Sequence, residues 1–364
     1  MPDSFRQAYA GLRNYIAQNP QIEMTDSVIG IPEEVRAGFY RVFNAAREAF
    51  VEEKFPVLLD RARLLQDNYV KAEGELAGLV SWEDAPTVSP VQRFLRSSRQ
   101  SLARELFDSM FDLLKGRESL ETFEQKGLQR IAAVWPPLFR GGYEKWAVLS
   151  LVKLLAPRGF LRVNVRPLNP GERGKSAVRV PSIEIPAPER SANLLFSQPY
   201  NAILAVPDLI VQSGALSRFV GIRSEFRPGL YNASNASLER EWSPIHADLL
   251  MSLESGLTLI YLAEKPESIS LVADATRFCR PDLVLGCIDT RIVPKDAAME
   301  AIAAADSRIN PVVGSYVVAC EPWPESGVNV ETGPASRIRF IKAGYDELQL
   351  LPVIDALVEP AGTT

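Results

Sequence analysis

Histidine and cysteine are scarce in this chain, which has one histidine, His246, and three cysteines, Cys279, Cys287 and Cys320. The number of cysteines is odd and no two of them form a CxxC pair, which disfavours a disulfide framework and a structural zinc site. A catalytic triad or a histidine-based metal site would have to use His246 alone. We expect His246 to be a satisfied residue at a helix start, and Cys287, within LVLGCID, to be buried and inert.

Long apolar runs and an excess of positive charge are also missing. No run approaches the ~18–20 residues that a membrane span needs. The start of the chain, MPDSFRQAYAGLRNYIAQNP, lacks the apolar segment of a signal peptide. The formal net charge is −5 and neither half of the chain is basic, which disfavours a dedicated nucleic-acid coat protein but not an enzyme with one local basic patch. We expect a cytoplasmic protein without a membrane partner; an oligomer is compatible with these features.

The first part of the chain has the pattern of helices. The length of 364 residues with 46% hydrophobic residues suggests two globular domains. Pro32, followed by two acids, predicts a helix start, and Pro56 predicts a helix boundary. The stretch VQRFLRSSRQSLARELFDSMFDLLKG predicts one amphipathic helix over 91–115. The prolines of PPLFRGG predict a break before a last helix. We therefore expect a helical domain over 1–156.

After residue 157 short runs rich in Val, Ile and Phe appear, such as FLRVNVRP, NAILAVPDLIV and RFVGIRSEFR, and these predict strands. From about residue 244 onward helices and strands alternate, which predicts crossover connections. The extended runs over 158–227 suggest an antiparallel entry to the sheet. The expected fold is therefore α + α/β: an N-terminal helical domain, then a C-terminal α/β domain over 157–364 with a mixed, largely parallel sheet.

The stretch PDLIVQSGALSRFVGIRSEFR, over 207–227, carries the clearest chemical signal. Asp208 enters one expected strand, Glu225 ends the next, and Arg227 follows two residues later. This order resembles the PD-(D/E)XK nuclease superfamily, the restriction-endonuclease-like fold, over about residues 195–290. In that family an Asp near one core strand and a Glu-x-Lys or Asp-x-Lys on the next form the site.

The resemblance implies a divalent-metal-dependent nuclease or an inactive derivative. Asp208 and Glu225 would hold Mg²⁺ or Mn²⁺, since hard cations prefer oxygen ligands. The metal would lower the pKa of a bound water and neutralise phosphodiester charge. Arg227 stands where the family has lysine; arginine binds a phosphate but is not a base, and the two are not interchangeable. The alternative is purely structural, with Asp208 in a turn and Glu225 on a solvated sheet face.

Two groups of basic residues are candidates for nucleic-acid contacts. Arg93 and Arg96 begin an arc of arginines on the expected helix 91–115, which Arg99 and Arg104 continue. Acidic neighbours on that helix offer the alternative of a solvated, balanced face. Arg173 and Lys175 lie in the loop NPGERGKS, which lacks the first glycine of a phosphate-binding loop and precedes a strand rather than a helix. A phosphate contact by either residue stays open.

Two further features have structural and functional interpretations. The aromatic stretch WPPLFRGGYEKWAVL would serve either as a platform for stacked bases or, as we prefer, as packing between domains. The strand–helix–strand pattern around 257–291 lacks GxGxxG, which disfavours a dinucleotide enzyme. A small-molecule site at Glu264-Lys265 or at Asp289-Arg291 remains compatible with it.

The sequence leaves three hypotheses for function. The first is a nucleic-acid-associated protein with a restriction-endonuclease-like domain, whose helical domain binds nucleic acid or a protein partner. The second is a non-enzymatic assembly or partner-binding protein. The third is a small-molecule-sensing α/β domain. The sequence does not decide whether the chain is an enzyme.

Overall fold

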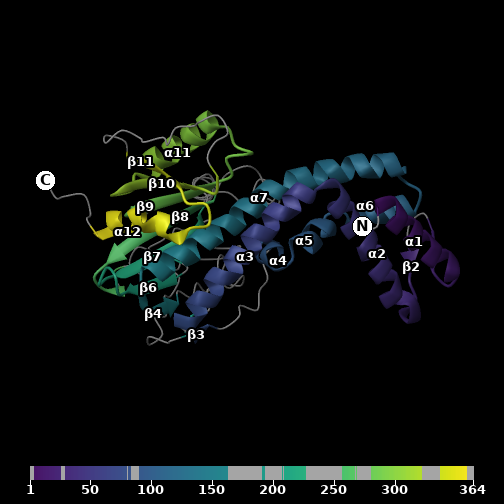
Figure 1. Ribbon diagram of the computed structural model, residues 1–364, viewed down its shortest axis with the longest axis horizontal. Helices are drawn as coiled ribbons and strands as arrows, with labels where there is room; N and C mark the ends of the chain where they lie inside the picture. The colour runs from purple at the N-terminus through teal and green to yellow at the C-terminus, as the bar shows by residue number, and fades with distance from the viewer. Residues whose placement is uncertain are drawn as a thin grey trace, which may run out of the picture. The chain divides into compact units, whose positions relative to one another are not determined.

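The computed structural model describes residues 4–25, 29–79, 81–82, 90–162, 191–192, 207, 209–226, 256–266, 268, 280–321 and 337–358. Contacts divide the chain into two compact units (Figure 1). The helical unit comprises residues 1–67 and 88–142, and the sheet unit comprises residues 68–87 and 143–364. The sheet unit therefore includes residues 143–156, which the sequence places in the helical domain.

The helical unit contains helices and one short strand pair. Two helices enter it only with their first parts, α3 (Pro56–Leu79) and α7 (Leu120–Leu154). The others are α1 (Phe5–Gln18), α2 (Glu33–Lys54), α4 (Pro90–Arg96), α5 (Ser98–Arg104) and α6 (Phe107–Leu114), and the strands are β1 (Glu23–Met24) and β2 (Ile29–Gly30). Strands β1 and β2 pair antiparallel. The predicted helix start at Pro32 and the boundary at Pro56 are both confirmed.

Residues 91–115 form three short helices, so the prediction of one continuous helix was wrong. Ser97, with φ −155° and ψ 88°, separates α4 from α5. Phe94, Leu102 and Met110 are all buried. These residues are eight apart, and on a straight helix each such step turns the side chain by about 80°. The breaks between α4, α5 and α6 allow all three side chains to be buried.

Helix α7 runs without interruption through Pro136 and Pro137, so the break predicted there was also wrong. A proline inside a helix costs about 3 kcal/mol, because it removes a hydrogen bond and crowds the preceding turn. The side chains around the two prolines, Trp135, Leu138 and Phe139, are buried. Burial of such large apolar side chains, at roughly 1.5–3 kcal/mol each, offsets that cost.

The core of the helical unit is built from phenylalanines. Phe5 stacks on Phe123 and meets Phe50 edge to face, which joins α1, α2 and α7. A second cluster, around Phe43, joins α2 to α6. Arg47 is buried beside it, with its guanidinium over the Phe43 ring, and donates to the Ala103 carbonyl at 3.0 Å.

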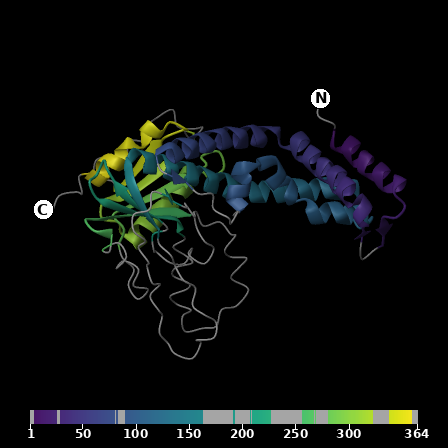
Figure 2. The same ribbon diagram turned by 90° about the horizontal axis from the view of Figure 1, so that it is seen from below.

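The sheet unit is organised around one seven-stranded sheet (Figures 1 and 2). The strand order is β11-β10-β9-β8-β7-β6-β4. These strands are β4 (Pro157–Arg162), β6 (Leu209–Ser213), β7 (Phe219–Phe226), β8 (Leu257–Ala263), β9 (Leu283–Ile288), β10 (Gly314–Ala319) and β11 (Ile338–Lys342). Two further short strands, β3 (Ser81–Trp82) and β5 (Ser191–Ala192), pair with each other.

The sheet is mixed, as the sequence predicts, but the expectation that it is largely parallel was wrong, because most of its described strand pairs are antiparallel. The connection between β6 and β7, for example, is too short for the crossover that parallel neighbours need. The strands from β4 to β9 pair antiparallel with their neighbours. Only β9, β10 and β11 run parallel. The antiparallel entry expected over 158–227 is thus present and extends further than predicted. The α + α/β fold class is confirmed.

Different helices cover the two faces of the sheet. Helix α11 (Lys295–Ile309) packs with Ala305 and Ile309 on Leu259 and Tyr261 of β8. Successive residues of a strand face opposite sides. Thr258 therefore faces away from α11, and it contacts Glu144 of α7 on that other face. The chain closes with a 3-10 turn (Glu347–Leu350) and α12 (Leu351–Val358).

The register defines two edges of the sheet, at which the strands begin or end. Strands β7, β9, β10 and β11 end at one edge, where β6 and β8 begin, and we call it the carboxyl edge. The other edge, where β9, β10 and β11 begin, we call the amino edge. Among the described residues, none of the helices combines the length and the apolar character needed to cross a membrane.

Glu53 joins the end of α2 to the start of α1 and generates a prediction about stability. Its carboxylate accepts from the Phe5 amide at 2.7 Å and contacts Lys54 at 2.8 Å. Hydrogen bonds from the Lys54 side chain and the Phe5 amide lower the pKa of Glu53. A lowered folded-state pKa gives stability that is present above the unfolded value, about 4.3, and is lost as the pH falls through the folded value.

We therefore expect Glu53→Gln to lower the free energy of unfolding by about 1 kcal/mol at pH 7, the usual size of a helix-cap effect. The difference should shrink toward zero near pH 3. Urea unfolding of both proteins at the two pH values measures it. Asp60→Asn is the control, because Asp60 and Arg63 form an exposed pair that contributes little. An equal loss at pH 7 and pH 3 would contradict the role of the ionised carboxylate.

Candidate functional site at the carboxyl edge

The strand pair β6–β7 is the frame for the predicted metal site. Leu209, the first residue of β6, pairs with Ile222 in the middle of β7, and Gln212 pairs with Phe219, so β7 runs four residues beyond the start of β6 toward the carboxyl edge. Glu225 is the penultimate residue of β7, and only its backbone is described. Asp208, which precedes β6, and Arg227, which follows β7, lie outside the described residues. The chain thus enters β6 and leaves β7 at the same edge of the sheet.

The ladder between β7 and β8 is irregular where Glu225 occurs. Arg223 pairs with Leu259 and Phe226 with Leu257, so three steps along β7 match two steps along β8. Such a bulge bends a strand and turns a side chain out of the regular alternation, and bulges are common beside active sites. The regular alternation of side chains along β7 is therefore interrupted between Arg223 and Phe226.

A buried carboxylate that the sequence did not single out also lies at this edge. Glu144, on α7, is 3% exposed and accepts a hydrogen bond of 2.7 Å from the Thr258 hydroxyl. Thr258 is the second residue of β8, and its neighbour Leu257 pairs with Phe226 at the end of β7. The sequence feature that could have indicated this buried carboxylate is the pair Glu-Lys inside the apolar, aromatic helix segment YEKWAVLSLVKLL.

Three further charged side chains are buried on or next to α7, β7 and β9. Lys145 follows Glu144 on α7, Arg223 is on β7, and Asp289 directly follows β9; their exposed fractions are 1%, 0% and 4%. Lys, Arg, Asp and Glu are almost never fully buried without partners, because removing a charge from water is costly. Arg223 pairs with Leu259 and so lies on the α11 face, whereas Glu144 approaches from the α7 face. Buried charged side chains on α7, on β7 and directly after β9 therefore belong to the described interior of the sheet unit.

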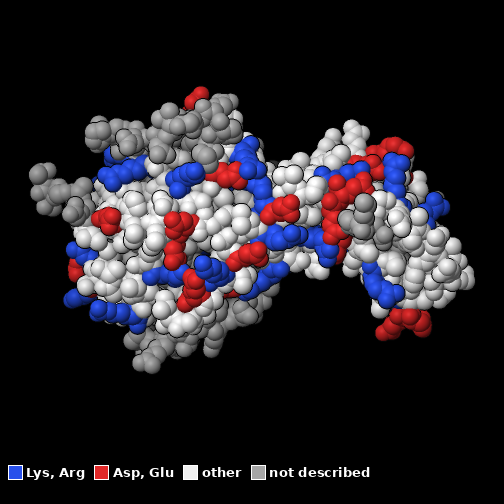
Figure 3. Space-filling view, in the orientation of Figure 1, with Lys and Arg blue, Asp and Glu red and all other residues white. Residues whose placement is uncertain are grey.

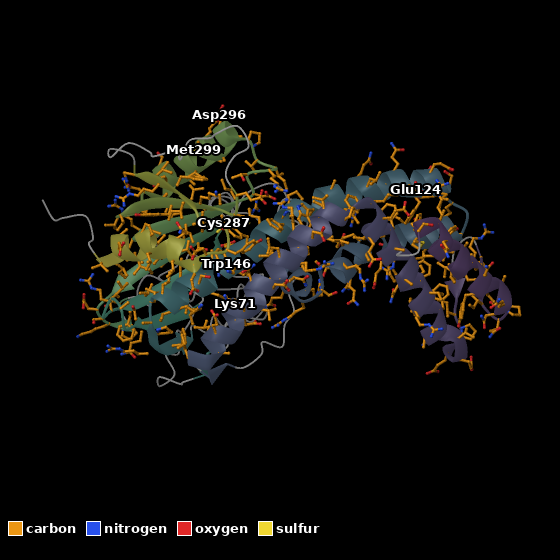
Figure 4. All side chains as sticks on the ribbon, in the orientation of Figure 1. Lys71, Glu124, Trp146, Cys287, Asp296 and Met299 are labelled. Atoms are coloured by element: carbon orange, nitrogen blue, oxygen red, sulfur yellow. The ribbon has the colours of Figure 1, made fainter. Side chains whose placement is uncertain are left out.

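Two buried thiols and a tyrosine complete the α7 side of this edge. Cys287 on β9, labelled in Figure 4, pairs with Val318, two residues before Cys320. Val317 and Ala319 pack on the α11 side, so alternation places both thiols on the opposite side, which α7 covers. The Tyr143 hydroxyl donates to the Gly344 carbonyl at 2.8 Å. Burial, with Cys287 and Cys320 nearby, raises the pKa of Tyr143 well above its ordinary value. The predicted burial of Cys287 is confirmed.

The aromatic stretch of α7 is packed inside rather than presented to a ligand. Trp135 stacks on Phe139 within the helical unit. Tyr143 stacks on Trp146 within the sheet unit, and Tyr345 meets both rings edge to face. All of these side chains except Tyr345 are almost completely buried. They therefore do not form a platform for stacked bases.

The predicted basic arc does not form on one helix. Arg93 and Arg96 lie on α4, half-buried and exposed respectively. Arg99, on α5, is paired with Glu48 and Glu52. On the face drawn in Figure 3, acidic and basic residues are interspersed rather than separated. Arg173 and Lys175 lie outside the described residues, as does His246.

The two stretches considered for small-molecule binding lie at opposite edges. Glu264 and Lys265 follow β8 at the amino edge, where Glu264 pairs with Arg218 at 3.0 Å. Asp289 and Arg291 follow β9 at the carboxyl edge, where the Asp289 carboxylate accepts from the Arg291 amide at 3.2 Å. In the part of the chain that the structure describes, no three His, Cys, Asp or Glu residues gather as a metal site.

The contribution of the hydrogen bond between Thr258 and Glu144 to stability can be tested by substitution. Thr258→Val keeps the shape of the side chain but removes the donor to a buried carboxylate, so we expect a loss of roughly 1–3 kcal/mol in the free energy of unfolding. Thr258→Ser keeps the hydroxyl and should lose clearly less. Urea unfolding of the three proteins at pH 7 compares them. Equal losses in both variants would show that packing, and not the hydrogen bond, stabilises this contact.

No family model, no curated protein and no solved structure matches this chain. The resemblance of residues 207–227 to a nuclease motif therefore rests on those residues alone. Function has to be argued from the chain's own geometry and charge.

Proposed function

We propose that this chain is a nucleic-acid-associated protein whose sheet unit holds a divalent-metal-dependent phosphodiesterase site of restriction-endonuclease-like type. Asp208 and Glu225 are the proposed ligands for Mg²⁺ or Mn²⁺, and Arg227 the proposed phosphate contact. The observation that carries the proposal is the register of β6 and β7, which brings the entry to one strand and the exit from the other to the same edge.

The residue types at this edge fit a hard cation. Such ions take oxygen ligands, and carboxylates are the preferred side chains. Glu144 adds a buried carboxylate at the edge where β7 ends and β8 begins. Arg223, buried two residues before Glu225, acts in the opposite direction, because a nearby positive charge disfavours a cation. We therefore expect weak metal binding.

The proposed roles follow from the chemistry of each group. A bound divalent ion supplies an acidified water and neutralises charge on the phosphodiester. Thr258 holds the Glu144 carboxylate in place through its hydroxyl. Arg227 keeps its positive charge at all working pH values, so it can bind a phosphate but cannot accept the proton of the attacking water. The buried apolar strands around the edge limit the access of bulk water.

Contacts to the nucleic acid outside this edge are proposed for four basic residues. Arg96 is exposed on α4, with Arg93 one turn before it. Arg173 and Lys175 belong to the basic loop of the sequence. Positive side chains of this kind bind phosphates without reading sequence.

A second candidate is a non-enzymatic protein that binds a partner through the helical unit. Val57 and Leu64, seven residues apart on α3, are 63% and 53% exposed. Seven residues return nearly to the same side of a helix, so the two side chains form one apolar stripe. Exposed apolar stripes often mark protein contacts.

The metal-site proposal predicts metal-dependent cleavage of DNA or RNA by the purified chain. Single- and double-stranded DNA and RNA are incubated with Mg²⁺, Mn²⁺ or EDTA, and products are resolved on gels. Asp208→Ala and Glu225→Ala should each reduce the rate by about 100-fold or more, the scale at which disturbed metal sites lose activity. Asp296→Ala is the matched control, because Asp296 is an exposed carboxylate on α11 (Figure 4).

Binding of Mn²⁺, measured by calorimetry, separates the remaining outcomes. Metal binding without cleavage, lost in both site variants, would identify an inactive derivative. Neither cleavage nor metal binding would reject the site and favour the partner-binding candidate. Cleavage that survives both site variants would reject Asp208 and Glu225 as ligands.

A further inference from the structure

Two arginines from distant parts of the chain meet at the loop that follows α11. Asn310 ends the helix in the left-handed conformation, with φ 50° and ψ 57°. Arg280 donates to the Asn310 carbonyl, to its side-chain oxygen at 3.3 Å, and to the Pro311 carbonyl at 3.1 Å. Arg337 donates to the same side-chain oxygen at 2.9 Å and to the same Pro311 carbonyl.

The shared acceptors hold the two guanidinium groups close together. One nitrogen of each group lies about 3 Å from Asn310 Oδ1, so these two nitrogens are at most about 6 Å apart. Both side chains are exposed. Within the described residues neither arginine forms an ion pair. Two like charges at this separation repel each other, and an anion that bridges them removes the repulsion.

The backbone around both arginines is fixed before any ligand binds. The Arg337 carbonyl accepts from the Ser315 amide at 2.9 Å, which ties the start of β11 to β10. Gly314, with φ +139°, allows this approach, since a Cβ there would lie 2.3 Å from the Arg337 oxygen. Pro281, next to Arg280, accepts from the Val312 amide at 3.0 Å. Preorganised donors lose little entropy when they bind.

Two carboxylates near these segments accept hydrogen bonds from other groups. Asp282 accepts from the Leu262 amide at 2.6 Å, and Asp306 accepts from the Ser315 hydroxyl at 2.6 Å. Burial raises the pKa of the half-buried Asp282, while the Leu262 amide and the positive charges of Arg218 and Arg280 act to lower it. The carbonyl groups of Asn310 and Pro311 explain part of the arrangement, because basic side chains often cap a helix end. Each guanidinium has five N–H donors, and these bonds use three on Arg280 and two on Arg337, which leaves two and three donors for a ligand.

We propose that Arg280 and Arg337 form an oxyanion site that binds a phosphate group. Guanidinium groups are suited to phosphate because their paired donors match two of its oxygens. The site lies at the amino edge, where β9 and β11 begin, and is separate from the proposed metal site at the carboxyl edge. The six residues of β9 or β10 span roughly 20 Å. The proposal does not depend on cleavage or on metal binding, and all its tests are done in EDTA.

The first test measures binding of a fluorescent 20-nucleotide DNA and of its duplex by anisotropy over a range of salt concentrations. Arg280→Gln/Arg337→Gln should weaken binding at low salt by about tenfold or more and lower the salt slope by about 2, one unit for each lost phosphate contact. Arg339→Gln is the matched control from the same strand, because that guanidinium is bonded to the Tyr316 hydroxyl at 2.8 Å. Unchanged binding in a folded double variant would reject the site as a nucleic-acid contact.

The second test uses the unaltered protein, since the double variant also removes bonds that hold the end of α11. Phenylglyoxal modifies accessible arginines, and peptide mapping reports the extent at Arg280, Arg337 and the control Arg339. If an oligonucleotide protects Arg280 and Arg337, the total concentration of its phosphate groups is compared with the orthophosphate concentration that gives the same protection. A value at least tenfold lower for the oligonucleotide identifies a nucleic-acid backbone as the ligand. Equal protection by orthophosphate identifies a site for a free phosphate or a small phosphorylated ligand. Absence of protection by either would overturn the proposal.

Discussion

Residues 143–155 are tied to the sheet at both of its edges, and the geometry of the candidate site depends on these ties. At the carboxyl edge Glu144 accepts from Thr258 at 2.7 Å and Tyr143 donates to the Gly344 carbonyl at 2.8 Å. At the amino edge the Ser213 hydroxyl donates to the Leu155 carbonyl at 2.8 Å. Since each residue of a helix turns about 100°, a shift by one residue would take Glu144 away from the strand ends. These hydrogen bonds therefore fix the rotation of α7 that places the Glu144 carboxylate beside the strand ends.

The interior of the sheet unit contains buried charged side chains. Buried charges cost free energy unless nearby groups compensate them, and apolar residues of the same size often stabilise a protein more. Glu144, Lys145, Arg223 and Asp289 are nevertheless buried. We expect weak affinity for a cation, because the positive charge of Arg223 repels the cation that the carboxylates attract.

The sequence predicted much of the fold where the signal is local. The strands of the sheet, the boundary at Pro56 and the burial of Cys287 all follow from residue type and near neighbours. The continuous α7 and the three helices α4, α5 and α6 were not predicted, because tertiary packing of side chains such as Trp135 and Met110 outweighs local preference there. For the site, the sequence singled out Asp208 and Glu225 but not Glu144. A lone carboxylate in a helix has no local sign that it will meet a strand more than a hundred residues later.

The sequence by itself determined which stretches are strands and which are helices, since periodicity in apolar residues is a property of neighbouring positions. Only the tertiary structure decided how the strands pair, in which direction, and in which register. The same holds for the contact of Glu144 with Thr258 and for the meeting of Arg280 with Arg337. The physical reason is that pairing between distant segments depends on the packing free energy of the whole core. No short stretch of residues encodes that sum.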